Sequence, residues 1–166
     1  MYATITGSEL IKQILIDSIE DLRANDSYLV EHDVHERTIC AHLANYLERR
    51  IKRVNPELSV DCEYNRNGID PKKLSRDFGE KHDVFPDIIV HKRGSNEFNI
   101  IVIEVKKSNC TSDDEEKDVR KLKAFTVSGE SGQYKYEIGV FLIVGFDSEC
   151  NCMEYRLRLF SDGEET

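Results

Sequence analysis

Residues 85–108 read FPDIIVHKRGSNEFNIIVIEVKKS, and this stretch decides the fold. It contains two runs of mostly β-branched residues, Ile88–Val90 and Ile100–Ile103, with Pro86 in front of the first run. The turn-forming segment Arg93–Asn96 separates them. Apolar β-branched runs joined by a short polar turn are typical of a hairpin. The pattern therefore predicts two paired strands that are too apolar to lie on the surface.

Three polar residues interrupt this apolar background. Asp87 opens the first predicted strand, and Glu104 and Lys106 close the second. Because side chains alternate along a strand, Glu104 and Lys106 share one sheet face, and the same alternation puts Ile100 and Val102 on that face. The opposite face takes Ile101, Ile103 and Val105. A turn centred in the middle of the connection brings Asp87 beside Glu104, so two carboxylates and an ammonium group meet at one edge of the sheet.

Carboxylates that crowd together either take up protons or share a cation. A hard divalent ion such as Mg²⁺ or Mn²⁺ accepts oxygen ligands and leaves water positions open for chemistry. A neighbouring lysine can hold or polarise the attacking water and stabilise charge that develops on a phosphate. The alternative is a partly buried ion network that closes the sheet edge and has no catalytic role, since burial of an ion pair is weak support for any function.

These motifs carry a resemblance to a known family. Pro86-Asp87 followed by Glu104-Val105-Lys106 resembles the signature of the PD-(D/E)xK nuclease superfamily, which has the restriction-endonuclease-like fold. The surrounding pattern is similar to a widespread branch of small bacterial proteins of that superfamily: HERT at His35–Thr38, EYNR at Glu63–Arg66 and KLK at Lys121–Lys123. The resemblance spans about Val34–Phe146.

The resemblance implies an α/β protein with a mixed sheet, built on an αβββαβ core. It implies a Mg²⁺-dependent (or Mn²⁺-dependent) nuclease that hydrolyses phosphodiester bonds in nucleic acid, with DNA as the expected substrate. Asp87 and Glu104 would hold the metal, and the Val105 carbonyl and Glu36 would complete its shell. Lys106 would position or activate the water without a covalent intermediate. The alternative is an inactive binding or interaction module on the same fold, in a defence or mobile-element system.

Glu36 also has an interpretation that does not need the family. Residues 34–54 have helical periodicity, with Asp33 as the expected N-cap. At 100° per residue, Glu36 lies about 20° from Leu43 on the apolar face of this helix. The acid therefore joins the metal site, or it complements the helix dipole in the first turn.

The other candidate site residues flank the hairpin. A strand is predicted at Leu58–Asn65, where Glu63 is a further ligand or part of a solvated face. Lys121 or Lys123, on a helix predicted after the hairpin, reaches the active site or a phosphate with Asp118 orienting one of them, or some of these residues form a solvated helix face. Three side chains of the kind that contacts sugar and phosphate end the first strand: Tyr64, Asn65 and Arg66.

We expect a single domain of 166 residues in three parts. Residues 1–30 add a helix, predicted at Ser8–Asn25, that can bind a second copy or a protein partner. Residues 34–146 form the core, with a basic loop at residues 67–84 that is either a flap over substrate or a disordered segment. The core ends in a buried strand at Tyr136–Phe146 that follows a helical crossover. Residues 147–166 add an edge strand at Met153–Phe160 and a polar tail.

Composition limits the function classes. The net charge of -9 opposes non-specific binding of nucleic acid by the whole surface. Residues 34–126, which contain the motif, nevertheless carry 18 bases and 17 acids, so local patches and a metal must supply the affinity. The sequence has no run long enough to cross a membrane and no leader pattern, which predicts a cytoplasmic protein. Five scattered cysteines predict reduced thiols.

Overall fold

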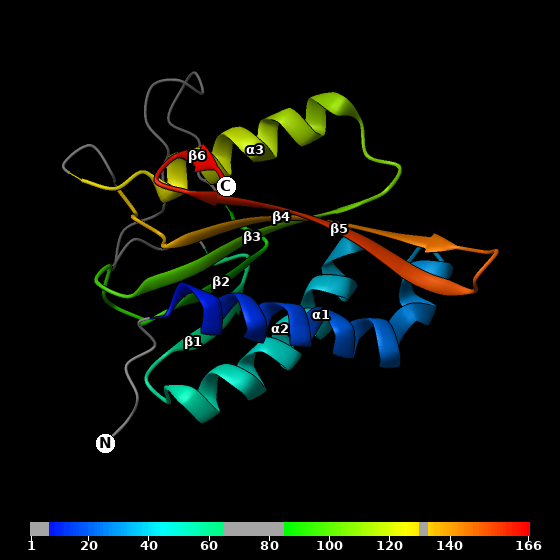
Figure 1. The fold of residues 1–166 in the computed structure, drawn as a ribbon, viewed down its shortest axis with the longest axis horizontal. Helices are drawn as coiled ribbons and strands as arrows, with labels where there is room; N and C mark the ends of the chain where they lie inside the picture. The colour runs from blue at the N-terminus through cyan, green and yellow to red at the C-terminus, as the bar shows by residue number, and fades with distance from the viewer. Residues whose placement is uncertain (1–6, 65–84, 130–132) are drawn as a thin grey trace.

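The chain folds into three layers, with one sheet between helices on both faces (Figure 1). The computed structural model describes residues 7–64, 85–129 and 133–166. Helices α1 (Ser8–Glu31) and α2 (Glu36–Val54) cover one face, and α3 (Ser112–Thr126) covers the other. Each face has its own apolar core, so the sheet is buried on both sides.

The sheet has six strands in the spatial order β1-β2-β3-β4-β5-β6. Their bounds are Ser59–Cys62 (β1), Ile88–His91 (β2), Asn99–Lys107 (β3), Ile138–Asp147 (β4), Cys152–Ser161 (β5) and Glu164–Glu165 (β6). All neighbouring pairs are antiparallel except β3 and β4, which are parallel and are joined by α3. A parallel pair needs such a crossover. The predicted mixed α/β class is confirmed, and the sheet is mostly antiparallel.

The two central strands follow from their sequences. Ile100–Val105 and Ile138–Val144 are buried over their whole length, which continuous apolar runs allow in a sheet that is covered on both faces. Glu104 is the exception, a carboxylate that is 1% exposed within one of these runs. The hairpin prediction is confirmed, because β2 and β3 pair antiparallel with Ile88 opposite Ile103.

One prediction about the faces of β3 is wrong. Val102 packs on the α3 side, as expected, but Ile100 packs with Ile101 on the α1–α2 side. The pairing slips between Val90 and His91, so that Val90 faces Ile101 while His91 faces Asn99. Such a β-bulge inserts one residue and breaks the alternation locally. Beyond the bulge the alternation holds up to the end of the strand.

Helix α1 is longer than predicted. It continues to Glu31 with a kink at Asp26, where the backbone is not helical. Ile11, Leu15 and Leu22 are buried in the core, and Val30 continues this buried stripe beyond the kink. The polar segment at residues 25–28 therefore bends the helix but does not end it.

The start of α2 also differs from the prediction. The N-cap is His35, whose ring Nδ1 accepts a hydrogen bond from the Arg37 backbone N–H at 3.3 Å. Asp33 lies outside the helix with a positive φ of 51°, and its carboxylate pairs with Lys107 at 2.7 Å. The expected cap is thus used in an ion pair with the end of β3.

The expectation of reduced cysteines is wrong for one pair. Cys150 and Cys152 form a disulfide at the turn from β4 to β5, while Cys40, Cys62 and Cys110 are free.

Among the described helices, none is long and apolar enough to cross a membrane. The loop predicted as a flap, residues 67–84, lies outside the described residues.

Candidate metal centre

The site lies where the start of β2 is beside the end of β3, because these two strands are antiparallel. Asp87 directly precedes β2, and Glu104, Val105 and Lys106 lie near the end of β3. The register places Ile88 opposite Ile103, so Asp87 lies beside Glu104 as predicted. One carboxylate oxygen of Asp87 accepts a hydrogen bond from the Val105 backbone N–H at 2.8 Å. This bond fixes the Asp87 side chain against the neighbouring strand.

Helix α3 closes the site from above. Lys121 Nζ lies 3.0 Å from Glu104 Oε2 and 2.5 Å from Asp118 Oδ1. Lys106 Nζ lies 3.1 Å from Asp118 Oδ2, which is close enough for an ion pair although the contact is misaligned for a hydrogen bond. Asp118 therefore contacts both ammonium groups. The crossover helix returns Asp118 and Lys121 over the sheet face that carries Glu104 and Lys106.

Glu36 lies on the other side of Lys106. Its Oε2 is 3.7 Å from Lys106 Nζ, and its Oε1 accepts a hydrogen bond from the Lys107 backbone N–H at 3.3 Å. The acid thus anchors the first turn of α2 to the end of β3. The prediction that Glu36 approaches the site is supported by these contacts, but they join it to Lys106 and to the backbone.

The charges of this cluster do not balance. Four carboxylates, those of Glu36, Asp87, Glu104 and Asp118, surround the two ammonium groups of Lys106 and Lys121. Among the residues that the structure describes, the formal excess is two negative charges, because Lys107 is engaged with Asp33 instead. Buried like charges either bind protons or attract a cation. A divalent ion would neutralise the excess.

The pKa of Glu104 reflects this excess of negative charge. Burial raises the pKa of Glu104 well above its usual value, and the nearby charges of Asp87 and Asp118 raise it further. The ammonium group of Lys121 lowers this pKa but does not compensate. Burial also raises the pKa of Asp87, and the hydrogen bond from Val105 offsets part of that effect.

The donor set can be tested against a metal ion. Within residues 7–64, 85–129 and 133–166, no group of three or more His, Cys, Asp or Glu side chains is arranged to hold a metal. Mg²⁺, however, is often held by one or two carboxylates, with waters and substrate phosphates in its other positions. Glu104 Oε1 is buried and has no hydrogen-bond partner in the described part of the chain. An unsatisfied buried carboxylate oxygen beside a second carboxylate fits a Mg²⁺ ligand pair.

A small pocket adjoins Asp87 on the α2 side. It has a volume of about 170 Å³, and Arg37, Cys40, Cys62, Glu63 and Asp87 line it. Glu63, predicted as a possible ligand, forms an ion pair of 2.7 Å with Arg37. Burial raises the pKa of Cys62 to about 11, so this thiol is neutral at pH 7 and adds no charge.

The residues predicted to bind substrate are placed differently from one another. Lys121 is 16% exposed and belongs to the ion network, so its ammonium group is engaged by two carboxylates. The Tyr64 ring packs edge-on against His91, with 4.6 Å between ring centroids. Asn65 and Arg66 lie outside the described residues.

Sequence reasoning missed the pocket residues Arg37 and Cys40, because helical spacing alone does not tell which strand end a helix face meets.

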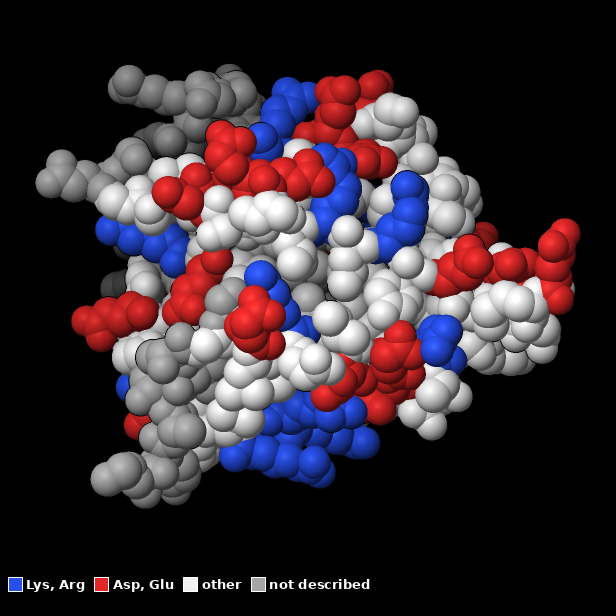
Figure 2. Space-filling model, viewed as in Figure 1, with Lys and Arg blue, Asp and Glu red and all other residues white. Residues whose placement is uncertain are grey.

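The surface charge is uneven around this core. Figure 2 shows acidic side chains spread over the visible face and a compact basic group at its lower edge, where α2 lies in Figure 1. The C-terminal half of α2 carries Arg49, Arg50, Lys52 and Arg53. Arg50 pairs with Asp21 of α1 at 2.6 Å, so part of this basic charge is neutralised within the protein.

Comparison with known proteins gives no relative. No protein-family model matches the chain, and neither a curated protein nor a solved structure does.

The raised pKa of Glu104 predicts a particular dependence of stability on pH. In metal-free protein, Glu104 retains a proton that the unfolded chain has already released, so its contribution to stability falls as pH rises from about 4.5 towards its raised pKa. Glu104→Gln removes this titration and leaves Lys121 paired with Asp118. The unfolding free energy of the variant minus that of the wild type should therefore increase as the pH rises through this range. Urea denaturation in EDTA at several pH values measures it.

A self-sufficient ion network gives the opposite result. If Glu104 is needed to neutralise Lys121, Glu104→Gln destabilises the metal-free protein at pH 7 by about 3 kcal/mol or more. Mg²⁺ would then stabilise neither protein. The matched control is Glu48→Gln, a half-exposed acid of α2 outside the cluster.

Proposed function

We propose that the chain is a Mg²⁺-dependent nuclease of the PD-(D/E)xK superfamily that hydrolyses phosphodiester bonds in nucleic acid, with DNA as the expected substrate. The observation that carries the proposal is the formal excess of two negative charges within the described part of the chain. This excess lies beside an oxygen of Glu104 that has no hydrogen-bond partner there, next to Lys106 on the same sheet face. This combination matches the requirements of metal-assisted phosphodiester hydrolysis. The sequence motif supplies the same residues.

The order of the elements supports the proposal. Helix α2, strands β1, β2 and β3, helix α3 and strand β4 follow one another as αβββαβ, with a parallel β3–β4 pair. This is the order that the restriction-endonuclease-like core requires. A fold alone does not define an activity, so the weight of the argument rests on the site.

Each side chain has a specific role in the proposed site. Asp87 and Glu104 would hold Mg²⁺ with the Val105 carbonyl, and the bound ion would polarise the phosphate and lower the pKa of a bound water. The hydrogen bond from the Val105 N–H occupies one Asp87 oxygen and leaves the other for the ion. Glu36 contacts Lys106 and would act as a positioning residue, which differs from the ligand role implied by the resemblance.

Lys106 works as a cation in this mechanism. Burial lowers the pKa of Lys106, but the charges of Asp118, Glu36 and Asp87 outweigh burial and raise this pKa above its usual value. A lysine that stays protonated at neutral pH cannot accept a proton from water. It donates hydrogen bonds, so it would orient the attacking water and stabilise the negative charge that develops on the phosphate. Proton removal then depends on the lowered pKa of the water bound at the ion.

A second candidate function is a nuclease-fold binding module that does not cleave. The observation that favours it is the ion network itself, because Lys106 and Lys121 are both held by Asp118 within the described structure. In such a module the acids would serve stability, and the surface would bind nucleic acid or a protein. Nuclease assays separate the two functions.

The first functional prediction concerns Asp87. Asp87→Asn keeps an oxygen that accepts the hydrogen bond from Val105 but removes the charge that would bind Mg²⁺. Cleavage of single-stranded, nicked and duplex DNA and of RNA, measured with Mg²⁺ or Mn²⁺, should fall on the order of 100-fold or more. Asp26→Asn is the control, because Asp26 also accepts a hydrogen bond, from Tyr46 at 2.6 Å; its carboxylate lies 3.1 Å from His42 as well.

Two outcomes would contradict the nuclease. Cleavage that persists equally in Asp87→Asn cannot come from this site. Wild-type protein that binds Mg²⁺ through Asp87 but cleaves none of the four substrates is the inert module.

The second functional prediction uses two adjacent lysines that point to opposite sides of β3. Lys106 belongs to the network beneath α3, whereas Lys107 pairs with Asp33. Lys106→Met should lower kcat on the order of 100-fold or more with little change in KM, because its charge acts on the developing phosphate charge. Lys107→Met should retain activity within about threefold. Equal losses in both variants would show that the effect comes from destabilised structure at the end of β3.

A further inference from the structure

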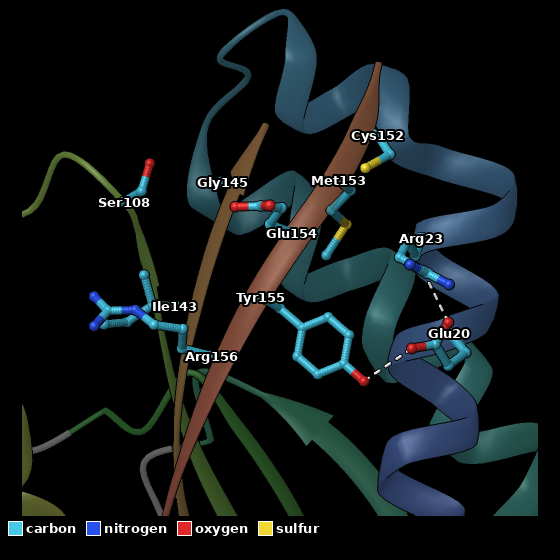
Figure 3. A pocket seen from close by; sticks show the side chains of 10 residues that line it. All are labelled: Glu20, Arg23, Ser108, Ile143, Gly145, Cys152, Met153, Glu154, Tyr155 and Arg156. Carbon is cyan, nitrogen blue, oxygen red and sulfur yellow. Dashed lines mark hydrogen bonds and ion pairs between the residues drawn. The ribbon is translucent and has the colours of Figure 1, made fainter. Parts of the chain in front are cut away.

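Strand β5 has a free edge over most of its length. One side of β5 pairs with β4 from Cys152 to Phe160. On the other side, β6 pairs only with Phe160 and Ser161. Figure 3 looks onto this edge, with β5 in front of β4, and a hollow of about 550 Å³ follows it. Among the described residues, no strand covers Cys152–Arg158.

The hydrogen-bonding groups on this edge can be assigned from one contact. The Thr166 backbone N–H donates to the Leu159 carbonyl at 2.9 Å, so the polar groups of Leu159 point away from β4. Backbone polar groups alternate sides along an antiparallel strand. The N–H and C=O groups of Met153, Tyr155 and Leu157 therefore point outward as well, and no described residue bonds to them.

The free segment is symmetric about Tyr155. It is bounded at one end by the turn that precedes Cys152 and at the other by Thr166, which lies opposite Leu159. Cys152 and Arg158, the last free residues, are both three positions from Tyr155. A copy of the strand laid antiparallel on this edge would thus fill the whole free segment when its own Tyr155 lies opposite.

The side chains have a complementary pattern about the same centre. Glu154 and Arg156 flank Tyr155, both are exposed, and neither forms an ion pair within the described structure. Met153 and Leu157, the next pair outward, are apolar. Reversing the strand therefore puts an acid opposite a base on both sides of Tyr155, and an apolar residue opposite an apolar one beyond them.

We propose that two copies of this chain associate through β5, antiparallel about a two-fold axis at Tyr155, into one continuous sheet. Tyr155 and the partner's Tyr155 exchange backbone hydrogen bonds, and Met153 does so with the partner's Leu157. Glu154 then lies opposite the partner's Arg156 as a non-hydrogen-bonded pair, the arrangement in which cross-strand side chains are closest. A two-fold axis makes each of these contacts occur twice.

The charged side chains on this edge favour an antiparallel second copy of the chain as the partner. Charged side chains on an edge strand ordinarily prevent pairing with other chains. Here a parallel copy would place Glu154 beside the partner's Glu154, and an antiparallel register shifted by two residues would place either Glu154 or Arg156 opposite its own copy. The antiparallel copy centred at Tyr155 pairs both Glu154 and Arg156 with an opposite charge, while Arg158 keeps its ion pairs with Glu115 and Glu165 of its own chain. This inference does not depend on the proposed nuclease activity.

Charge reversal tests the proposal, because both side chains are exposed and neither forms an ion pair among the described residues. Glu154→Arg places arginine opposite the partner's Arg156 twice, and Arg156→Glu places two acids opposite each other twice. Each variant alone should weaken the dimer on the order of tenfold or more, measured by sedimentation equilibrium from about 10 μM to about 1 mM. An equimolar mixture of the two variants should form a heterodimer, since every cross-strand pair is then opposite in charge. The double variant should dimerise like the wild type.

Other results would overturn it. Wild-type protein that stays monomeric over this range has no such interface. If both single variants still dimerise like the wild type, or if their equimolar mixture forms no heterodimer, the copies associate through another surface. Ile16→Asp on the exposed side of α1 identifies that surface if it alone disrupts the dimer. Circular dichroism confirms that each variant is folded.

Discussion

The burial of the Glu104 carboxylate is the constraint on which the rest of the site depends. The side chain lies within the central apolar strand β3 and beneath α3, where water cannot solvate its charge. Lys121 compensates for part of this cost, but Asp87 and Asp118 add further negative charge nearby. A proton on Glu104 or a bound cation at this position would relieve the remaining cost. The proposed Mg²⁺ site is the second solution, and the titration of Glu104 in metal-free protein is the first.

Much of the architecture could be predicted because it follows from periodicity. The apolar runs of β2, β3 and β4 are long and β-branched, and the connections between them leave few arrangements. The approach of Asp87 to Glu104 needed only the alternation of a strand and a hairpin register. The change at Ile100 could not be predicted, because nothing in the sequence marks the bulge that shifts this residue to the other face.

The parts of the site that sequence reasoning missed come from contacts between elements. Asp118 was predicted to orient one lysine of its own helix, yet it also reaches Lys106 of β3, a contact that depends on the tilt of α3 over the sheet. Glu36 lies 3.7 Å from Lys106, but which of its neighbours it contacts depends on how α2 docks. The disulfide between Cys150 and Cys152 closes a turn at the end of the sheet that composition alone did not indicate.

The most direct measurement is the anomalous scattering of Mn²⁺ soaked into crystals of the protein. The account predicts a single strong peak between Asp87 and Glu104, about 2.1–2.3 Å from a carboxylate oxygen of each and within reach of the Val105 carbonyl. The peak should vanish in Asp87→Asn crystals treated in the same way. Density that shows Lys121 and water filling the space around Glu104, with no peak at Mn²⁺ concentrations that saturate other magnesium enzymes, would contradict the metal site and the nuclease proposed from it.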